Sequence, residues 1–402
     1  MKRSVFIIIG VVLVIVLMSV WVYVLFFSNP SSVEEEQFGD LNFGDTTDVD
    51  YQEPVVVSES EPEPVVDIQT NQRLRQLTTR PVAGFTEMPV STSTPRKVLY
   101  MEGGTGHIYS IDLTTGAENR ISATTIAGAQ TAEFSEDGRY VMIQSGFGPQ
   151  KEFVVGEINL GSSTLSNTKL AEPITSFSST KDNRFLYSIQ TAASTIGKVF
   201  NPTEFTNETL FTLPFREASI EWGDDLSDSH YAYPKTTRHL ESFLFRVKNG
   251  VVTRMPVDGY GMSALGNDNY ILYSKQVNNE YQSYYLDTNS GQETIAPLTQ
   301  IPEKCVMSEE EFPITICANT EYESTSLLPD SWYKGEVSTA DSLWEISPDG
   351  MSARFLISPE LTSGRLLNIT QLQITDDKSH VYFTNQSDQT LWVYERITTD
   401  VN

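Results

Sequence analysis

The chain has 402 residues and a formal net charge of −26 at neutral pH. An acidic excess of this size disfavours binding to nucleic acid and to anionic membrane surfaces, because phosphate groups are recognised by clustered lysine and arginine side chains. Two interpretations stay open, a solvated acidic surface and a surface that attracts cations or a basic partner.

The N-terminal segment predicts a membrane anchor. Val5–Phe27 is 23 residues long and carries no charge, and as a helix it would extend about 35 Å, enough to cross a hydrocarbon core of about 30 Å. Lys2 and Arg3 precede it, so residues 1–4 form a cytoplasmic tip and the rest of the chain is extracytoplasmic. A cleaved signal peptide is the alternative, but the run is longer than such a peptide requires, and no Ala-x-Ala site follows it.

Residues 28–70 predict a disordered acidic linker. Val33–Thr70 holds 12 acidic residues and no basic one, and it lacks sustained hydrophobic periodicity, so it cannot bury a core. Its simplest role is a tether between the membrane and the following domain. A docking motif built on Phe38, Leu41 and Phe43 is a weaker alternative.

Residues 71–398 contain short β-rich runs that recur about every 44 residues, and the steps between their starts are 43, 45, 46, 39, 44 and 67. Strand-like units with a period of about 40–45 residues are typical of the four-stranded blades of a β-propeller. We therefore predict an all-β, seven-bladed β-propeller, while six or eight blades remain possible because the 67-residue step could contain another element. The runs are Lys97–Glu102, Tyr140–Ser145, Phe185–Gln190, Tyr231–Pro234, Tyr270–Lys275, Ile314–Asn319 and Val381–Thr384.

Polar turns separate the first and second strands of the repeats, at Ser135–Gly138, Lys181–Asn183 and Asp376–Lys378. The repeat also predicts how the ring closes. The segment that starts at Leu77 matches the segment that starts at Ile121, one period later. Residues 72–77 should therefore form the outer strand of the last blade, which removes the exposed edges of an open ring.

The long step contains an insertion at Leu327–Asp341, with the adjacent aromatic residues Trp332 and Tyr333. Aromatic side chains on loops can anchor a partner, and we take these two as the candidate partner contact. The alternative is that they pack the insertion onto its own blade.

Cys305 and Cys317 are the only cysteines, and they lie at equal distances from the centre of a predicted hairpin at Glu311. Directly opposed residues of antiparallel strands lie within reach of a disulfide, and an extracytoplasmic location permits oxidation. We predict a disulfide, with two reduced buried thiols as the alternative.

The sequence carries no recognisable catalytic chemistry. Its four histidines form no metal-binding pattern, and neither a nucleophile elbow nor a phosphate-binding glycine loop is present. The acidic pairs at Asp224–Asp225 and Asp376–Asp377 could supply acid–base groups or calcium ligands, but turns are the ordinary place for such pairs. We predict no catalytic residue, no cofactor and no metal.

Several stretches of the chain resemble a known family: Thr105–Ser122, Glu303–Ser308, Ile316–Ala318 and Asp330–Ile346. They are similar to uncharacterised membrane-anchored β-propeller proteins of candidate-phyla bacteria, the Parcubacteria-like lineages. In that family a tryptophan often stands where this chain has Met307, a change that affects local packing. The resemblance implies an anchor, a linker and an envelope location, and the looser likeness to WD40- and TolB-type repeats implies binding rather than chemistry.

These observations favour a membrane-tethered extracytoplasmic propeller that binds an envelope protein or glycan as a scaffold module. The alternative is an enzyme, most plausibly a carbohydrate-active one, with carboxylates gathered from several blades at the central channel. A structural subunit of a surface machine is a third possibility.

Overall fold

The structure is a computed structural model that describes Met18 and residues 73–89, 95–159, 162–320, 325–350 and 352–397. The chain divides into two units, Met1–Glu61 and Pro62–Asn402, and all described residues except Met18 belong to the second. The predicted membrane span (apart from Met18) and the acidic linker lie outside the described residues. Across the residues that are described, no helix is both long and apolar enough to cross a membrane.

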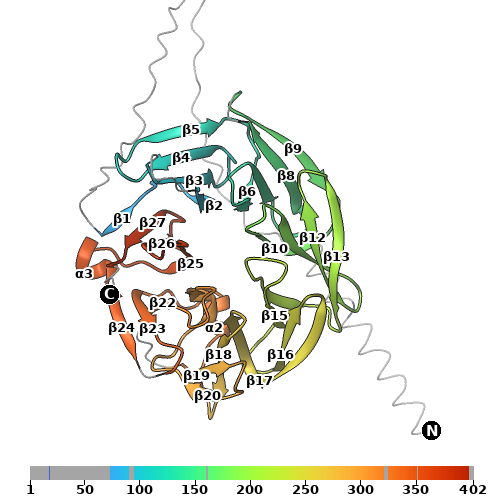
Figure 1. Cartoon of the computed structure of the whole chain (residues 1–402), viewed down its shortest axis with the longest axis vertical. Coiled ribbons are helices and arrows are strands. Elements are labelled where there is room, and N and C mark those ends of the chain that lie inside the picture. The colour runs from blue at the N-terminus through green and yellow to red at the C-terminus, as the bar shows by residue number, and fades with distance from the viewer. Residues whose placement is uncertain are drawn as a thin grey trace, which may run out of the picture. The chain divides into compact units, whose positions relative to one another are not determined.

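In the second unit, the described residues fold into six antiparallel β-sheets arranged around a ring (Figure 1). Three sheets are consecutive in the chain: β2–β5 (Val82–Glu87, Lys97–Glu102, Ile108–Asp112, Glu118–Ser122), β6–β9 (Ala129–Phe134, Tyr140–Ser145, Glu152–Asn159, Thr164–Leu170) and β10–β13 (Ile174–Ser179, Phe185–Gln190, Thr195–Asn201, Thr206–Leu213). A seven-stranded sheet follows, formed by β14–β20 (Ala218–Glu221, His230–Pro234, Glu241–Lys248, Val251–Gly266, Tyr270–Val277, Glu280–Asp287, Glu293–Ile295).

The last two sheets are β21–β24 (Cys305–Met307, Thr315–Asn319, Ser342–Ile346, Ala353–Ile357) and β25–β27 (Ile369–Ile374, His380–Asn385, Leu391–Glu395) with β1 (Leu74–Gln76). Short helical segments lie in the connections: η1 (Gly148–Gln150), η2 (Pro302–Lys304), α2 (Asp330–Tyr333) and α3 (Pro359–Ser363). Figure 1 shows β2, β6, β10 and β25 facing the centre of the ring and β5, β9, β13 and β24 on its outside.

The inner strands are apolar on both faces because each one enters two hydrophobic cores. In β7, Val141 and Ile143 pack with residues of the preceding sheet. Tyr140 and Met142 point the other way and pack with Phe185 of the following sheet. Successive side chains of a strand lie on opposite faces, so a sheet between two neighbours buries both faces and needs a continuous apolar run.

The long strand β17 is shared by two four-stranded units, because it pairs with β16 in one and with β18 in the other. Its first residues pair with β16, from Val251 opposite Lys248, and its last residues pair with β18, ending at Gly266 opposite Ile271. Both registers shift near the middle of the strand, where Gly261 has a left-handed backbone with φ of 61°. Glycine adopts this conformation without strain, so the strand can turn from one unit into the next without a break.

The ring closes through β1, which pairs with the last strand, β27, with Leu74 opposite Tyr394. The backbone N–H of Leu77 then donates to the carbonyl of Leu391 at 2.7 Å. Leu74 and Leu77 are both buried. This is the pairing that the offset between the two matching segments predicts.

Cys305 lies opposite Cys317 in the register of β21 and β22, and their sulfur atoms are bonded. The predicted disulfide is confirmed. The insertion lies between β22 and β23 of the same sheet and contains α2. It is attached to the neighbouring sheet, because the Arg238 backbone N–H donates to Asp330 Oδ1 at 2.8 Å and the Gln276 side chain donates to the carbonyl of Leu328 at 2.6 Å.

Candidate binding site in the central cavity

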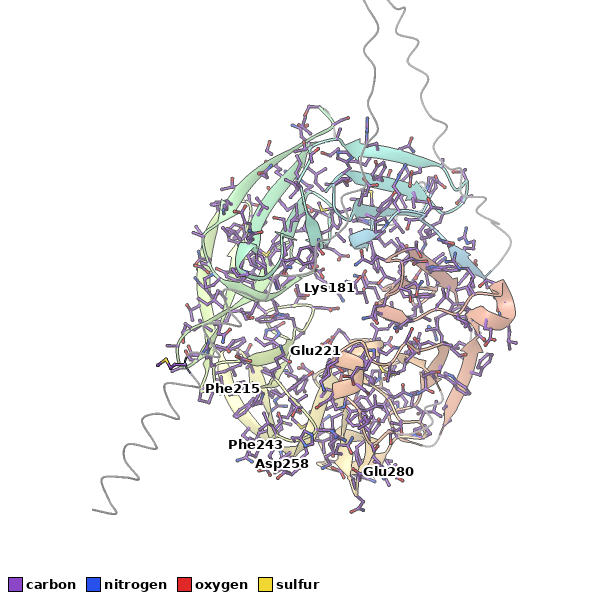
Figure 2. All side chains as sticks on the ribbon, turned by 180° about the vertical axis from the view of Figure 1, so that it is seen from behind. Lys181, Phe215, Glu221, Phe243, Asp258 and Glu280 are labelled. Carbon is purple, nitrogen blue, oxygen red and sulfur yellow. A yellow bond between two sulfur atoms is a disulfide. The ribbon has the colours of Figure 1, made fainter. Side chains whose placement is uncertain are left out.

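A cavity of about 1000 Å³ is lined by the first strands of all six sheets and by the turns that follow them. In Figure 2, Lys181 and Glu221 lie toward the middle of the ring, whereas Phe243, Asp258 and Glu280 lie at its rim. Ten acidic and three basic side chains belong to the lining, so the cavity has a strong negative excess. They are Glu87, Glu133, Glu136, Glu221, Asp224, Glu303, Glu309, Glu310, Asp376 and Asp377, against Arg96, Lys181 and Lys378.

A repeated turn places several of these charges. In three turns a Ser or Thr hydroxyl donates to the Asp carboxylate two residues later, and the residue after the Asp has a left-handed backbone; the sets are Ser135–Asp137–Gly138, Thr180–Asp182–Asn183 and Thr375–Asp377–Lys378. The residue between the hydroxyl and the carboxylate takes no part in this bonding. Its side chain lines the cavity in each case, as Glu136, Lys181 and Asp376. We call this the variable position of the turn.

A fourth turn shares the contact from a hydroxyl to the carboxylate two residues later, but this carboxylate is a glutamate and no left-handed residue follows it. The Ser308 hydroxyl donates to Glu310 at 3.4 Å and leaves Glu309 at the variable position. Burial raises the pKa of Glu309 to about 8, with a further contribution from the negative charge of Asp224. Burial and the charge of Asp376 likewise raise the pKa of Glu136. The charges of these carboxylates therefore interact across the opening of the cavity. We call this opening, lined by Glu136, Lys181, Glu309 and Asp376, the mouth.

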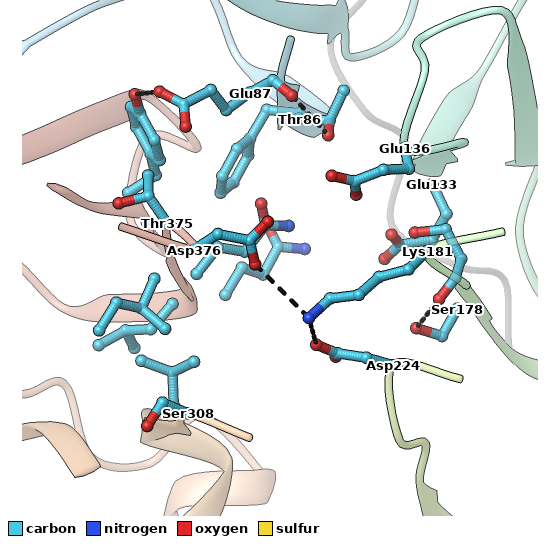
Figure 3. A pocket seen from close by; sticks show the side chains of 18 of the residues that line it. Thr86, Glu87, Glu133, Glu136, Ser178, Lys181, Asp224, Ser308, Thr375 and Asp376 are labelled. Atoms are coloured by element: carbon cyan, nitrogen blue, oxygen red, sulfur yellow. Dashed lines mark hydrogen bonds and ion pairs between the residues drawn. The ribbon is translucent and has the colours of Figure 1, made fainter. Parts of the chain in front are cut away.

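Lys181 is the one lysine at a variable position among these turns. Its ammonium lies 3.1 Å from a carboxylate oxygen of Asp224 and 3.5 Å from one of Asp376, which belong to different sheets (Figure 3). Burial opposes its charge, but these two carboxylates outweigh burial and raise the lysine pKa. A single cation of the chain thus occupies a position between acidic groups of two sheets.

Three further carboxyls of the cavity wall are partly buried. Burial raises the pKa of Glu133 to about 7 and that of Glu221 to about 8, and the charge of Glu303 contributes to the second shift. Burial also raises the pKa of Glu303, although a hydrogen bond from the Tyr333 hydroxyl opposes the shift. Near neutral pH, Glu133 and Glu221 can donate as well as accept protons.

Contacts between neighbouring turns hold the mouth in shape. The backbone N–H of Asp137 donates to the side chain of Asn183 at 2.8 Å, and the N–H of Lys181 donates to the carbonyl of Asp224 at 3.0 Å. Arg96 bridges Glu87, at 2.7 Å, and Asp377 of the last sheet. These contacts are made within the chain itself and fix the positions of the turns, and a preorganised site lowers the cost of binding.

Trp332 and Tyr333, the predicted partner contact, have different surroundings. Trp332 is half-buried and packs against a small core of Tyr281, Ile301 and Leu328. Tyr333 is 45% exposed, and its hydroxyl reaches the cavity carboxylate of Glu303. The insertion therefore connects to the cavity wall through Tyr333.

Sequence reasoning preferred a turn role for Asp224 and Asp376, with acid–base groups or calcium ligands as the alternative. It did not identify Lys181, Glu221 or Glu309 as cavity residues. The signal that could have found three of these five is the variable position of the repeated turn. Glu221 carries no such signal, because it ends an ordinary strand, β14.

The described residues contain no group of three or more His, Cys, Asp or Glu side chains arranged to hold a metal ion. No histidine belongs to the lining of the cavity. The groups that the cavity offers are therefore carboxyls, two lysines, one arginine and hydroxyls.

The chain resembles solved β-propeller proteins in fold. An oligogalacturonate lyase in complex with manganese has a TM-score of 0.53 at 8% identity and covers 80% of this chain and 93% of its own. An oligogalacturonate lyase from Vibrio parahaemolyticus has a TM-score of 0.51 at 10% identity, with 82% and 95% covered. The β-propeller domain of the trilobed protease from Pyrococcus furiosus has a TM-score of 0.46 at 11% identity, with 78% and 94% covered.

No protein-family model matches the chain, and no curated protein matches it either. At these identities the likeness to solved structures extends to the fold alone. The described part of the chain is thus all-β, with the fold of β-propeller proteins.

Proposed function

We propose that this chain is a membrane-tethered, extracytoplasmic, seven-bladed β-propeller that binds a cationic segment of an envelope protein at the acidic mouth of its cavity. Five four-stranded sheets and a seven-stranded sheet with the shared strand β17 support a count of seven blades. The apolar run Val5–Phe27 supports the tether.

The charge of the cavity carries this proposal. Ten acidic side chains face three basic ones within one cavity of about 1000 Å³, and walls of low dielectric strengthen the field of such a group. Lys181 shows what kind of ligand group the mouth can hold. Its ammonium group lies between the carboxylates of Asp224 and Asp376, which belong to two different sheets. Lysine and arginine side chains of a partner would meet the same kind of carboxylates at Glu136 and Glu309.

An enzyme with a site in the cavity is the second candidate, and one observation favours it. Glu133 and Glu221 have pKa values of about 7 and about 8, as a general acid near neutral pH requires. The substrate named for the oligogalacturonate lyases is a polymer of acidic sugars, which this negative cavity would repel. A carbohydrate substrate of this chain would therefore be neutral or cationic.

The proposal is tested by measuring peptide binding to the full-length chain in detergent, with fluorescence anisotropy. A labelled lysine- and arginine-rich peptide is compared with a glutamate-rich peptide of equal length and with a neutral oligosaccharide. We expect binding of the basic peptide only, weakening as salt is added. At about pH 9, above the pKa of Glu309, replacing Glu136, Glu309 and Asp376 by their amides should weaken binding at least about tenfold, since each exposed charge contributes about 0.5–1 kcal/mol.

A matched control removes three acidic charges from outside the cavity, at Glu152, Glu157 and Glu280, which are exposed. Equal loss of binding in both triple variants would refute a site at the mouth. Turnover of an oligosaccharide by the purified chain, lost in Glu221→Gln, would support the enzyme instead. The topology has its own test: protease added to intact cells should digest the propeller, and complete protection would refute an extracytoplasmic location.

A further inference from the structure

A fully buried lysine lies at the boundary between the β21–β24 sheet and the sheet of β25–β27. Lys304 ends η2, and its side chain is 0% exposed. Its ammonium nitrogen lies 2.6 Å from Asp341 Oδ2, 2.6 Å from the Thr339 hydroxyl and 3.3 Å from Asn368 Oδ1. Asp341, Thr339 and Asn368 are also buried. Buried lysines are rare, and this one faces a carboxylate and a carboxamide at once.

The surroundings of this group are apolar. Leu367 and Ile369, on either side of Asn368, belong to the hydrophobic core that the two sheets share. Such surroundings disfavour a charged ammonium group, and burial lowers the pKa of Lys304. A neutral lysine amine is a nucleophile.

The side chains of Asp341, Thr339 and Asn368 surround the Lys304 amine with the groups that an acyl transfer uses. The base, Asp341, is within hydrogen-bond reach of the amine and is oriented by the backbone N–H of Ile369 at 2.7 Å. The Thr339 hydroxyl lies 2.8 Å from Asn368 Oδ1, where it can polarise the carboxamide carbonyl. The second carboxylate oxygen of Asp341 is buried without a hydrogen-bond partner, so it is available to pass a proton on.

We propose that Lys304 and Asn368 form an intramolecular isopeptide bond, with Asp341 as the acid–base group and Thr339 as the carbonyl donor. The neutral Lys304 amine attacks Cγ of Asn368, and a bond forms between Nζ and Cγ. Asp341 takes a proton from the attacking nitrogen and gives one to the Asn368 amide nitrogen. The bond between Cγ and Nδ2 then breaks and ammonia leaves, with no change in oxidation state.

The bond would add a covalent link between two sheets that the backbone joins only through the segment from β24 to β25. Lys304 immediately precedes β21, whose Cys305 is tied to Cys317 within its own sheet. Asn368 immediately precedes β25, in the sheet that β1 closes. The isopeptide bond would therefore lock the closing blade to its neighbour, as an envelope protein exposed to proteases and variable conditions requires.

The test is the mass of the full-length chain after reduction and denaturation, followed by tandem mass spectrometry of its proteolytic peptides. We expect the chain to be lighter than its sequence by the mass of one ammonia, and the peptides of Lys304 and Asn368 to be found linked. A mass equal to that of the reduced sequence would refute the bond. A loss of water, with a link to Asp341, would refute the assignment of Asn368.

Variants separate the chemistry from packing. Asp341→Asn and Asn368→Ala should abolish the mass loss, while Asn267→Ala, which removes an equally buried asparagine of another sheet, should retain it. Asn368→Asp should lose water instead of ammonia and reach the same final mass as the natural chain, because both routes produce the same amide. If Asn368→Asp instead keeps its unlinked mass while folded, the proposed geometry is wrong.

Discussion

Glu221 allows a sharp test of the cavity electrostatics. Burial, reinforced by the charge of Glu303, raises the pKa of its carboxyl from 4.5 to about 8. Between these two values the folded chain binds a proton that the unfolded chain has released. The free energy of unfolding therefore falls as pH rises from about 4.5 to about 8, and it is insensitive to Glu221 below and above this window.

The size of the effect follows from the shift. One unit of pKa corresponds to about 1.4 kcal/mol, so ionising Glu221 costs the folded state up to about 5 kcal/mol above pH 8 and about 3 kcal/mol near pH 7. Glutamine is similar in shape but cannot ionise. We expect Glu221→Gln to be more stable than the natural chain by these amounts, and to match it near pH 4.

Urea unfolding of both chains at about pH 5, pH 7 and pH 9 measures this difference. Glu217→Gln is the matched control, because Glu217 is exposed and immediately precedes β14. A stability difference that does not change with pH would refute the account, and so would a Glu221→Gln chain less stable than the natural one at pH 9.

Three further changes test the mouth, the closure and the disulfide. Lys181→Met should strengthen binding of a basic peptide about threefold to tenfold at low salt, because it frees two carboxylates; unchanged anisotropy titrations would contradict this. Leu77→Ala, at a buried position of the closing segment, should lower the free energy of unfolding in urea by about 2–4 kcal/mol, whereas Val251→Ala, at an exposed position, should change it little. Replacing Cys305 and Cys317 by serine should cost about 2–3 kcal/mol, and a melting temperature equal to that of the oxidised chain would count against a stabilising bond.

The strands and the ring closure could be predicted because their signals are local or periodic. The run Tyr140–Ser145 reads as a buried strand from its own residues, and the match between the segments at Leu77 and Ile121 needs only the repeat length. The register of Cys305 and Cys317 follows from their equal distance to the hairpin centre. Each of these inferences spans a few residues or one period.

The cavity could not be predicted in the same way, because its members meet only when six sheets come together. Glu221 and Glu133 lie on inner strands. The alternation of side chains along a strand predicts which face a residue lies on, but it does not predict that a cavity adjoins that face. The group around Lys304 has the same origin: its partner Asn368 is 64 residues away, and no periodicity connects the two.

The repeated turn explains how the charge at the mouth can vary while the hydrogen bonds of the turn stay the same. The hydroxyl, the Asp carboxylate and the left-handed residue close each turn, and none of them is the residue that faces the cavity. Glu136 and Lys181 have opposite charges at the variable position, yet their turns share the same hydrogen bonds and backbone. The turn therefore places no demand on the sign of this charge. The proposed binding of a cationic segment would account for the excess of acidic residues at the variable position, because the residue after each turn-opening Ser or Thr would then match the charge of the ligand.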